Sequence, residues 1–399
     1  MARAAVHTAG SVPESSLDLF AEAHLDDPYG DYRGLRNSGP AVYFPSYEVW
    51  ALPRYEECRA ALADWKTFTS EEGVSVAPEF KPLFDNSPLY SDPPRHERLR
   101  RVLSERLAPR ALASLKEDID ERADRLIAAL VERGSFDAVA DMAAIFPINV
   151  VSDLVGLPQE GREHFLERAA ATFNLFGPNN ARAQAAMGHY EAVGKYILES
   201  ATRETLTPGG FGMTIYDAVD AGTIDETEGF VLMVAYLVAA LDTTVNTLSA
   251  SIWHLARNRE QWALVRDDPE LAGNAFEEAL RIETPLVFFA RTARTDCTFG
   301  EVTIPAGARV LVMFASANRD ERRWEEPDRF DVQRKTTGHL GFGYGIHGCA
   351  GQGLARLEGR AILAALARRA KAIDVGEPVR EYNNVIRGLK SLPTVLTPA

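Results

Sequence analysis

The spacing of apolar residues predicts a chain that is helical through its middle and forms strands only near its ends. Apolar positions recur three and four residues apart in ALASLKEDIDERADRLIAALVERG (111–134) and in AFEEALRIE (275–283), which is the period of an amphipathic helix. Alternation with a period of two is confined to AVYFP (41–45), VWALP (49–53), EVTIPAGARVLVMF (301–314) and PTVLTP (393–398). We therefore expect a mainly α fold with small peripheral β-sheets.

The longest apolar run belongs to a helix that has to pass through the middle of the molecule. TIDETEG (223–229) offers an N-cap at Thr223 or Asp225, and Glu228 supplies the acid of a capping box. Helical spacing continues to about residue 256, so at 1.5 Å per residue the helix is roughly 45 Å long. Its apolar part, FVLMVAYLVAAL (230–241), is followed directly by Asp242, Thr243 and another threonine. Polar side chains in a buried helix cost stability, so we expect these to have a function.

Two stretches lack any such periodicity. Residues 1–16 read as an N-terminal arm, and residues 17–399 as one domain without internal repeats. Residues 72–94 include APEFKPLFDNSPLYSDPP, whose five prolines predict a loop that can form the wall of a pocket.

Composition and charge exclude several classes of partner. The 399 residues are 46% hydrophobic and carry a formal net charge of −14, which disfavours binding to nucleic acids and to anionic membranes. The N-terminus has no apolar core of signal-peptide length, and the longest apolar run has 12 residues, too few to span a membrane. We therefore expect a cytoplasmic protein, and we expect it to be a monomer.

The three cysteines, Cys58, Cys297 and Cys349, are widely spaced and form no CxxC pair. This argues against a disulfide framework and against a structural zinc site. Cys349 differs from the other two, because it lies among glycines in GFGYGIHGCAGQ (341–352), just before an amphipathic run. It could be a buried core cysteine, a nucleophile with His347 as its base, or a thiolate ligand. The surrounding glycines and the positive end of the following helix favour a thiolate ligand to the iron of a haem.

This stretch resembles the haem-ligand loop of the cytochrome P450 superfamily. The family pattern is matched in register by Phe342, Gly345, His347, Cys349 and Gly351. The resemblance implies a P450 fold, with the long central helix crossing over a haem b whose axial ligand is Cys349.

Further motifs of the same family follow in order. Glu278 and Arg281 match its Glu-x-x-Arg pair, and Arg329 in EPDRF occupies the position of the arginine that joins them. The resemblance also implies the residues that bind the haem propionates, which are His96, Arg100, Arg291 and His347.

In the central helix, Asp242 and Thr243 resemble the acid–alcohol pair that the family uses to activate dioxygen. Ala240 stands where the family usually has glycine. The pair implies a monooxygenase rather than a non-catalytic haem sensor. The chain has no flavin or nicotinamide fingerprint, so electrons would come from a ferredoxin or similar protein. Four arginines mark either its docking patch or a solvated basic helix, namely Arg98, Arg101, Arg106 and Arg110.

The chain is also similar along nearly its whole length to the branch that demethylates 4-methoxybenzoate. The stretches that carry this similarity include FNLFGPNN (173–180), LTPGGFG (206–212) and YNNVIRGLKSLP (382–393). The resemblance implies a pocket for a flat aromatic ring, walled by Leu89, Phe173, Phe176, Val238, Ala239, Leu286 and Phe289.

The residues expected to hold the substrate carboxylate depart from the relatives' pattern. Leu83 stands at the position of a loop arginine, and the helix positions that carry serines in relatives read Val234, Ala235 and Val238. Asn86 and Ser87 remain as donors, with Lys81 or loop N–H groups in support. We expect oxidative O-demethylation of 4-methoxybenzoate-type acids to 4-hydroxybenzoates and formaldehyde. The alternative is a P450 for a neutral aromatic ether or a terpene, which needs no carboxylate anchor.

Overall fold

The computed structural model describes residues 12–162 and 165–399. Its α-helices are α1 (Glu22–Asp26), α2 (Tyr29–Ser38), α3 (Tyr55–Ala63), α4 (Lys81–Phe84), α5 (Arg95–Arg106), α6 (Pro109–Ala113), α7 (Lys116–Arg133), α8 (Ile145–Val155), α9 (Phe165–Thr172), α10 (Ala181–Ser200), α11 (Phe211–Asp220), α12 (Glu226–Arg257), α13 (Arg259–Asp267), α14 (Leu271–Ile282), α15 (Phe314–Ala317) and α16 (Gln352–Arg369). Short 3₁₀ turns are Pro78–Phe80, Pro88–Tyr90, Phe173–Phe176 and Gly345–His347, and Ala138–Ala143 is a π-helical turn.

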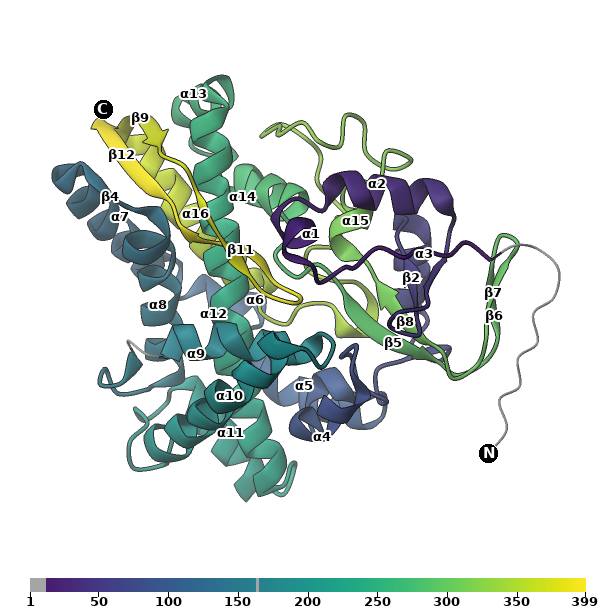
Figure 1. Cartoon of the computed structure of the whole chain (residues 1–399). Coiled ribbons are helices and arrows are strands. Elements are labelled where there is room, and N and C mark those ends of the chain that lie inside the picture. Colours follow the sequence, from purple (N-terminus) through teal and green to yellow (C-terminus); the bar gives the residue numbers. More distant parts are fainter. Residues whose placement is uncertain (1–11, 163–164) are drawn as a thin grey trace.

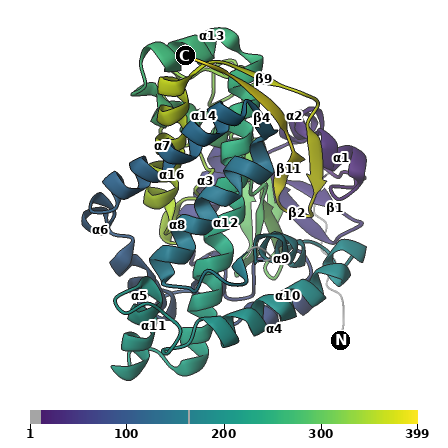
Figure 2. The same ribbon diagram turned by 90° about the vertical axis from the view of Figure 1, so that its left-hand side faces the viewer.

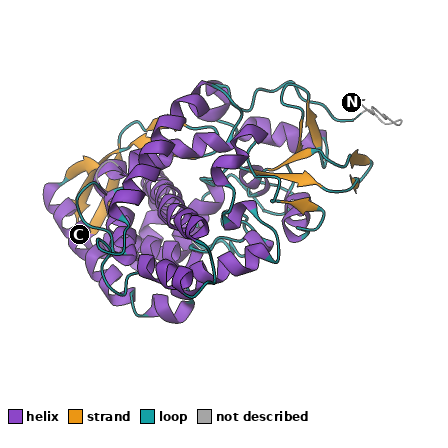
Figure 3. Ribbon diagram, turned by 90° about the horizontal axis from the view of Figure 1, so that it is seen from below, coloured by secondary structure: helices purple, strands orange, loops and turns teal. Residues whose placement is uncertain are grey.

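The strands form four small sheets at the edges of the helical body. They are β1 (Val42–Phe44), β2 (Val49–Leu52), β3 (Phe68–Thr69), β4 (Ser135–Asp137), β5 (Phe289–Ala293), β6 (Cys297–Phe299), β7 (Val302–Ile304), β8 (Arg309–Val312), β9 (Ala370–Val375), β10 (Val379–Tyr382), β11 (Arg387–Ser391) and β12 (Pro393–Pro398). The largest sheet has the order β1-β2-β8-β5-β3, β4-β12-β9 form a second, and β10–β11 and β6–β7 are hairpins. Seen from below, strands lie at two opposite edges and helices fill the space between them (Figure 3). The prediction of a mainly α fold with peripheral sheets is confirmed.

The long helix α12 runs through the middle of the helical body (Figures 1 and 2). Its N-cap is Asp225 rather than Thr223: the Asp225 side chain accepts from the Glu228 N–H at 2.8 Å, and the Glu228 carboxylate accepts from the Asp225 N–H at 3.1 Å. Arg98 of α5 donates to both oxygens of Glu228, at 2.6 and 2.7 Å. The capping box predicted from the sequence therefore also joins α12 to α5.

Within the described residues, two helical stretches are long and apolar enough to cross a membrane by length and composition alone. They are Ala138–Val155 and Glu226–Arg257. In the most apolar 18 residues of each stretch, 56% and 59% respectively are buried inside the molecule. Core helices of globular proteins pass the same test, and α12 is surrounded by other helices. We interpret both stretches as core elements.

Two segments expected to be irregular are more ordered than predicted. In the arm, residues 1–11 lie outside the described residues, but Pro13 and Ser15 pair with Tyr43 of β1 through backbone hydrogen bonds of 2.8 and 2.9 Å. The proline-rich stretch contains α4 and two 3₁₀ turns, and the Val76 N–H donates to the Phe176 carbonyl at 2.9 Å. This stretch is therefore held against the segment that precedes α10.

A buried ion network fixes α14 to the loop that leads to Cys349. Arg281 donates to both Glu278 oxygens, at 2.7 and 2.8 Å, and both side chains are fully buried. The third member is Arg334, whose Nε donates to Glu278 Oε1 at 3.0 Å. The prediction of Arg329 was wrong: its exposed guanidinium pairs with Glu326 and Asp331, each at 3.1 Å.

We expect Arg334→Ala to lower the free energy of unfolding by about 1.5–3 kcal/mol, because it removes one charge-assisted hydrogen bond from the buried Glu278, which stays paired with Arg281. Arg329→Ala is the matched control and should change it by less than about 0.5 kcal/mol, since the Arg329 guanidinium is itself exposed. Urea unfolding of the two variants measures the difference. Equal losses would show that Arg334 does not hold Glu278.

Candidate active site

One cavity lies under α12 and over the Cys349 loop. It encloses about 2140 Å³ of atom-free space, counting its open mouths. Its wall extends from the Cys349 loop to α12 and the proline-rich loop, so one space joins the predicted ligand loop to the predicted substrate contacts. The described residues bring Cys349, the predicted propionate-binding residues and nearly all predicted substrate contacts to its wall.

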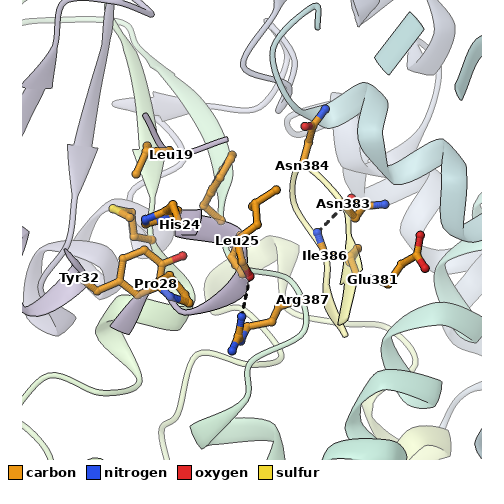
Figure 4. Close-up of a pocket in the computed structure, with 13 residues that line it drawn as sticks. Leu19, His24, Leu25, Pro28, Tyr32, Glu381, Asn383, Asn384, Ile386 and Arg387 are labelled. Atoms are coloured by element: carbon orange, nitrogen blue, oxygen red, sulfur yellow. Dashed lines mark hydrogen bonds between the residues drawn. The ribbon is translucent and has the colours of Figure 1, made fainter. Parts of the chain in front are cut away.

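A second, smaller cavity lies between α1, α2 and the β10–β11 hairpin (Figure 4). Two of its polar side chains are engaged: His24 bonds to Asp31 at 2.7 Å, and Arg387 donates to the Leu25 carbonyl at 2.8 Å. No cysteine lies among its lining residues. We attribute the chemistry to the larger cavity.

The loop before α16 holds Cys349 at the floor of the large cavity. The Cys349 N–H donates to the Phe342 carbonyl at 2.8 Å, which closes the loop on itself. Gly345 has a φ of +71°, and a Cβ there would lie 2.2 Å from the Leu62 carbonyl oxygen, so its glycine is required by α3 rather than by a ligand. A Cβ on Gly351 would meet nothing nearer than the Cys349 sulfur at 4.0 Å, so this glycine leaves space around the sulfur.

Opposing effects act on the Cys349 thiol. Burial raises its pKa, while the N–H groups of Gly351 and Gln352 and the charges of Arg100 and Arg356 lower it. The start of α16 thus favours the thiolate as predicted, but burial outweighs it. A metal cation deprotonates a coordinating thiol outright. The loop is therefore suited to hold Cys349 as a thiolate when a metal binds to its sulfur.

The four predicted propionate ligands line the cavity together. The rings of His96 and His347 lie 4.5 Å apart in an edge-to-face arrangement. Both ring nitrogens of His96 are buried without a hydrogen-bond partner, and the Nε2 of His347 is buried with Asp92 Oδ1 3.8 Å away, beyond hydrogen-bond distance. Arg291 is 3% exposed and donates to the carbonyl of Ala290, and Arg100 donates to the Gly348 carbonyl. Unpartnered buried donors and cations of this kind fit the two carboxylates of a haem.

The face of α12 toward the cavity carries Ala239, Ala240 and Thr243. The Thr243 hydroxyl donates back to the Ala239 carbonyl over a long 3.4 Å contact. Asp242 is not part of the lining. It is 6% exposed, and its Oδ2 is buried without a partner. Burial raises the pKa of Asp242 to about 7, with hydrogen bonding from Asn246 opposing this shift and the charge of Glu381 adding to it.

The predicted aromatic pocket is assembled on the distal side. Its members come from the proline-rich loop, the 3₁₀ turn before α10, α12 and the segment around β5; those lining the cavity are Ser87, Leu89, Phe173, Phe176, Val238, Ala239, Leu286 and Phe289. Phe176 lies 5.7 Å from Phe173 and 5.3 Å from Phe289 between ring centroids.

The structure does not bring the predicted contact Asn86 to the cavity. It has a φ of +70°, and its Oδ1 accepts a hydrogen bond from Arg95. Lys81 is also absent from the lining, because its Nζ pairs with Asp85 at 2.9 Å. The prediction that Asn86 faces the substrate was therefore wrong, since its turn directs the amide to a neighbouring helix.

Sequence reasoning missed several lining residues, among them Phe84, Tyr190, Tyr236 and Glu358. Phe84 stacks on Phe176 with a centroid distance of 4.6 Å. Its only signal was its place in the proline-rich loop. Glu358 lies on α16 and is buried, with Oε1 unpartnered. In the sequence it cannot be told from the exposed acids of an amphipathic helix.

Fold and site together define a haem-thiolate protein, with a cysteine on one side of the cavity and the polar residues of α12 on the other. A model of the family described as Cytochrome P450 matches residues 217–373. Cytochrome P450 CYP199A2 of Rhodopseudomonas palustris is 45% identical over 98% of this chain and 96% of its own length. The cytochrome P450 monooxygenase PikC of Streptomyces venezuelae is 34% identical over 98% and 97%. The structure of cytochrome P450 CYP109Q5 from Chondromyces apiculatus superposes with a TM-score of 0.81 at 29% identity, covering 96% of this chain and 98% of that one.

The chain belongs to the cytochrome P450 family, and it is a haem-thiolate iron monooxygenase of the bacterial type. Its expected class as an oxidoreductase enzyme is thereby confirmed.

We expect Arg291→Leu to have opposite effects with and without haem. The apoprotein should become more stable, because the buried guanidinium forms no salt bridge: the nearby Asp92 is paired with Arg294 at 2.9 Å. The holoprotein should lose haem about 10–100-fold faster, since a charge-assisted hydrogen bond contributes about 1.5–3 kcal/mol. Haem transfer to an excess of a haem-scavenging globin measures the rate. Arg309→Leu on the neighbouring strand is the control, because Arg309 bonds to loop carbonyls and is not in the lining; its haem loss should be unchanged.

The raised pKa of Asp242 predicts a pH-dependent stability. Between about pH 4 and 7 the folded state holds a proton that the unfolded state has lost, so stability falls as pH rises, by about 1.4 kcal/mol per pH unit from this group. Asp242→Asn removes this slope. The free energy of unfolding of the variant should therefore rise relative to that of the wild type from pH 5 to 7, and the difference between the two should stay constant above pH 8. Urea unfolding at these pH values tests this; parallel curves from pH 5 upward would contradict it.

Proposed function

We propose that the protein removes the methyl group of a small para-methoxy aromatic compound of the 4-methoxybenzoate type. The balanced reaction takes the methoxy arene, dioxygen, two electrons and two protons to the phenol, formaldehyde and water. Electrons come from NADH through a separate carrier. The observation that carries the proposal is the aromatic section of the cavity, formed by Phe173, Phe176 and Phe289, which shares one cavity with Thr243 of α12.

The dimensions of this section favour a flat ring. Phe173, Phe176 and Phe289 approach one another edge to face or tilted, with interplanar angles of 53° and 68°. Val238 and Ala239 of α12 complete the wall. Aromatic edges and branched aliphatic groups bind the faces and rim of a benzene ring. We infer that the ring lies between these side chains with its methoxy group toward Cys349.

When bound, the haem supplies an activated oxygen atom, and the chain's own residues control the protons. The long Thr243–Ala239 contact is weak, so the hydroxyl can turn into the cavity and donate there. Asp242 is adjacent in sequence and has a pKa near 7, which suits a group that takes up and releases protons at neutral pH. We infer that Thr243 donates the proton and Asp242 renews it.

Electron delivery uses a partner protein, since bacterial P450s draw on ferredoxin-type donors. In the structure, two of the four arginines of the predicted docking patch are bound to other residues. Arg98 is bound to Glu228, and Arg106 donates to the Thr214 hydroxyl at 2.9 Å. Arg101 and Arg110 remain exposed and are the members that we propose for docking.

The experiment measures formaldehyde release, NADH oxidation and hydrogen peroxide with 4-methoxybenzoate and its methyl ester as substrates. We expect formaldehyde and the matching phenol in equal amounts from at least one of them. Formaldehyde from neither would contradict the proposal. Thr243→Ala should lower product per NADH about tenfold or more and divert electrons to peroxide. Ser251→Ala is the control, because Ser251 donates to the Thr247 carbonyl one turn further along α12 and is not in the lining.

A further inference from the structure

The cationic groups of the described cavity wall are all accounted for by the haem. The arginines of the lining are Arg100 and Arg291, and they lie with His96 and His347. Haem b brings two propionate carboxylates, so two guanidinium charges balance two carboxylate charges. The histidines add hydrogen-bond donors. After haem binding, this cluster has no unmatched cation for a third carboxylate.

Another part of the cavity wall is apolar and aromatic. It is formed by Leu83 and Phe84 of the loop, Phe176 and Tyr190. Phe84 stands 4.6 Å from Phe176 and 5.7 Å from Tyr190 between centroids, and the Tyr190 hydroxyl donates to the Leu83 carbonyl at 2.5 Å. That hydroxyl proton is already used by the protein.

The loop's own cations are directed elsewhere. Lys81 pairs with Asp85 at 2.9 Å, and neither side chain is in the lining. Arg95 lies 3.4 Å from Glu228 and donates to Asn86, also outside the lining. No lysine or arginine of the described loop therefore reaches the cavity.

The hydroxyls of the distal wall are mostly engaged as well. Thr172 donates to the Ala169 carbonyl at 2.7 Å, and Thr247 to the Thr243 carbonyl at 2.8 Å. In the loop, the Ser87 oxygen accepts from the Tyr90 N–H at 3.2 Å, which leaves its own proton to donate. One neutral donor suits a carbonyl or ether oxygen; it does not replace the several donors that a buried carboxylate needs.

Glu358 is a further ionisable group of the wall, and it supplies no positive charge for an anionic ligand. It is 1% exposed, and its Oε1 has no partner. Burial raises its pKa well above the usual range. It is therefore no substitute for the arginine or lysine that would balance a carboxylate.

We propose that the enzyme selects para-methoxy aromatic compounds that are uncharged at the end remote from the iron, with the Ser87 hydroxyl donating to an oxygen there. Esters, aldehydes and ketones of this shape fit the site, whereas the ionised benzoate does not. This inference rests on the proposed function for the orientation of the ring. It replaces the carboxylate anchor expected from Asn86 and Ser87 by a single neutral donor.

The test compares 4-methoxybenzoate with its methyl ester on the holoenzyme, because the two differ only at the remote end. Binding is followed by the change in the haem absorption spectrum from pH 6 to 8. We expect the ester to bind at least tenfold tighter at pH 7.4 with no dependence on pH. The apparent affinity for the acid should fall about tenfold per pH unit, since only its protonated fraction enters.

Tighter binding of the acid, unchanged from pH 6 to 8, would overturn the inference, while formaldehyde release from the acid would leave the proposed function standing. Conversely, formaldehyde from neither compound would remove the proposed function, and the binding comparison would still decide the charge preference. The two failures are therefore distinguishable.

Variants test the location of the remote end. Leu83→Arg places a cation at the loop wall and should raise affinity for the acid at least tenfold, whereas the uncharged Leu83→Met should not. Ser87→Ala should weaken ester binding about fivefold or more, whereas Asn86→Gly, which keeps the positive φ accessible, should not. An acid affinity unmoved by Leu83→Arg, or equal effects of the Ser87 and Asn86 variants, would overturn the assignment of this end.

Discussion

The structure depends on a group of buried positive and donor side chains whose neighbouring acid, Asp92, is already bound by Thr69 and Arg294. Arg291 is nearly fully buried beside Asp92, His96 and His347, and the His96 ring has no hydrogen-bond partner at either nitrogen. Such groups cost free energy in the empty cavity. A dianionic ligand relieves that cost, so haem binding and the stability of this region are linked. The same linkage orients the ligand, because the carboxylates have to face the cluster and the ring then lies over Cys349.

The helical period of α12 places Thr243 and Asp242 on different faces of the helix. Consecutive residues point about 100° apart on a helix, so Thr243 faces the cavity while Asp242 faces the side where the β10–β11 hairpin packs. Gly388 permits that packing: a Cβ there would lie 1.8 Å from Asn246 Oδ1, one turn along from Asp242. The hairpin thus keeps water from the carboxyl and raises its pKa. The substrate therefore contacts the neutral hydroxyl of Thr243 and does not contact the carboxyl group of Asp242.

Sequence reasoning succeeded where local pattern carries the information. The capping box at Asp225, the extent of α12 and the strands near both ends follow from period and propensity, and the Cys349 loop from its motif. It failed where a side chain had a choice of partners in space. Arg334 rather than Arg329 reaches Glu278, Asn86 turns to Arg95, and Arg98 is taken by Glu228. Each of these arginines has several acids or amides at similar distances along the chain, and only the packing of the loops decides between them.

The same distinction explains why chemistry and substrate choice are held by different parts of the molecule. Cys349 and Thr243 sit at the start of one helix and in the middle of another, where backbone hydrogen bonds and core packing fix them within narrow limits. The remote end of the cavity is built from Leu83, Phe84 and Ser87, on short turns that are secured by a few contacts such as the Tyr190–Leu83 hydrogen bond. A single loop substitution can change the charge of that end without moving the haem, whereas a change at Cys349 or Thr243 alters the reaction itself. The apolar loop wall of this chain therefore determines which substrates bind, and the class of reaction does not depend on it.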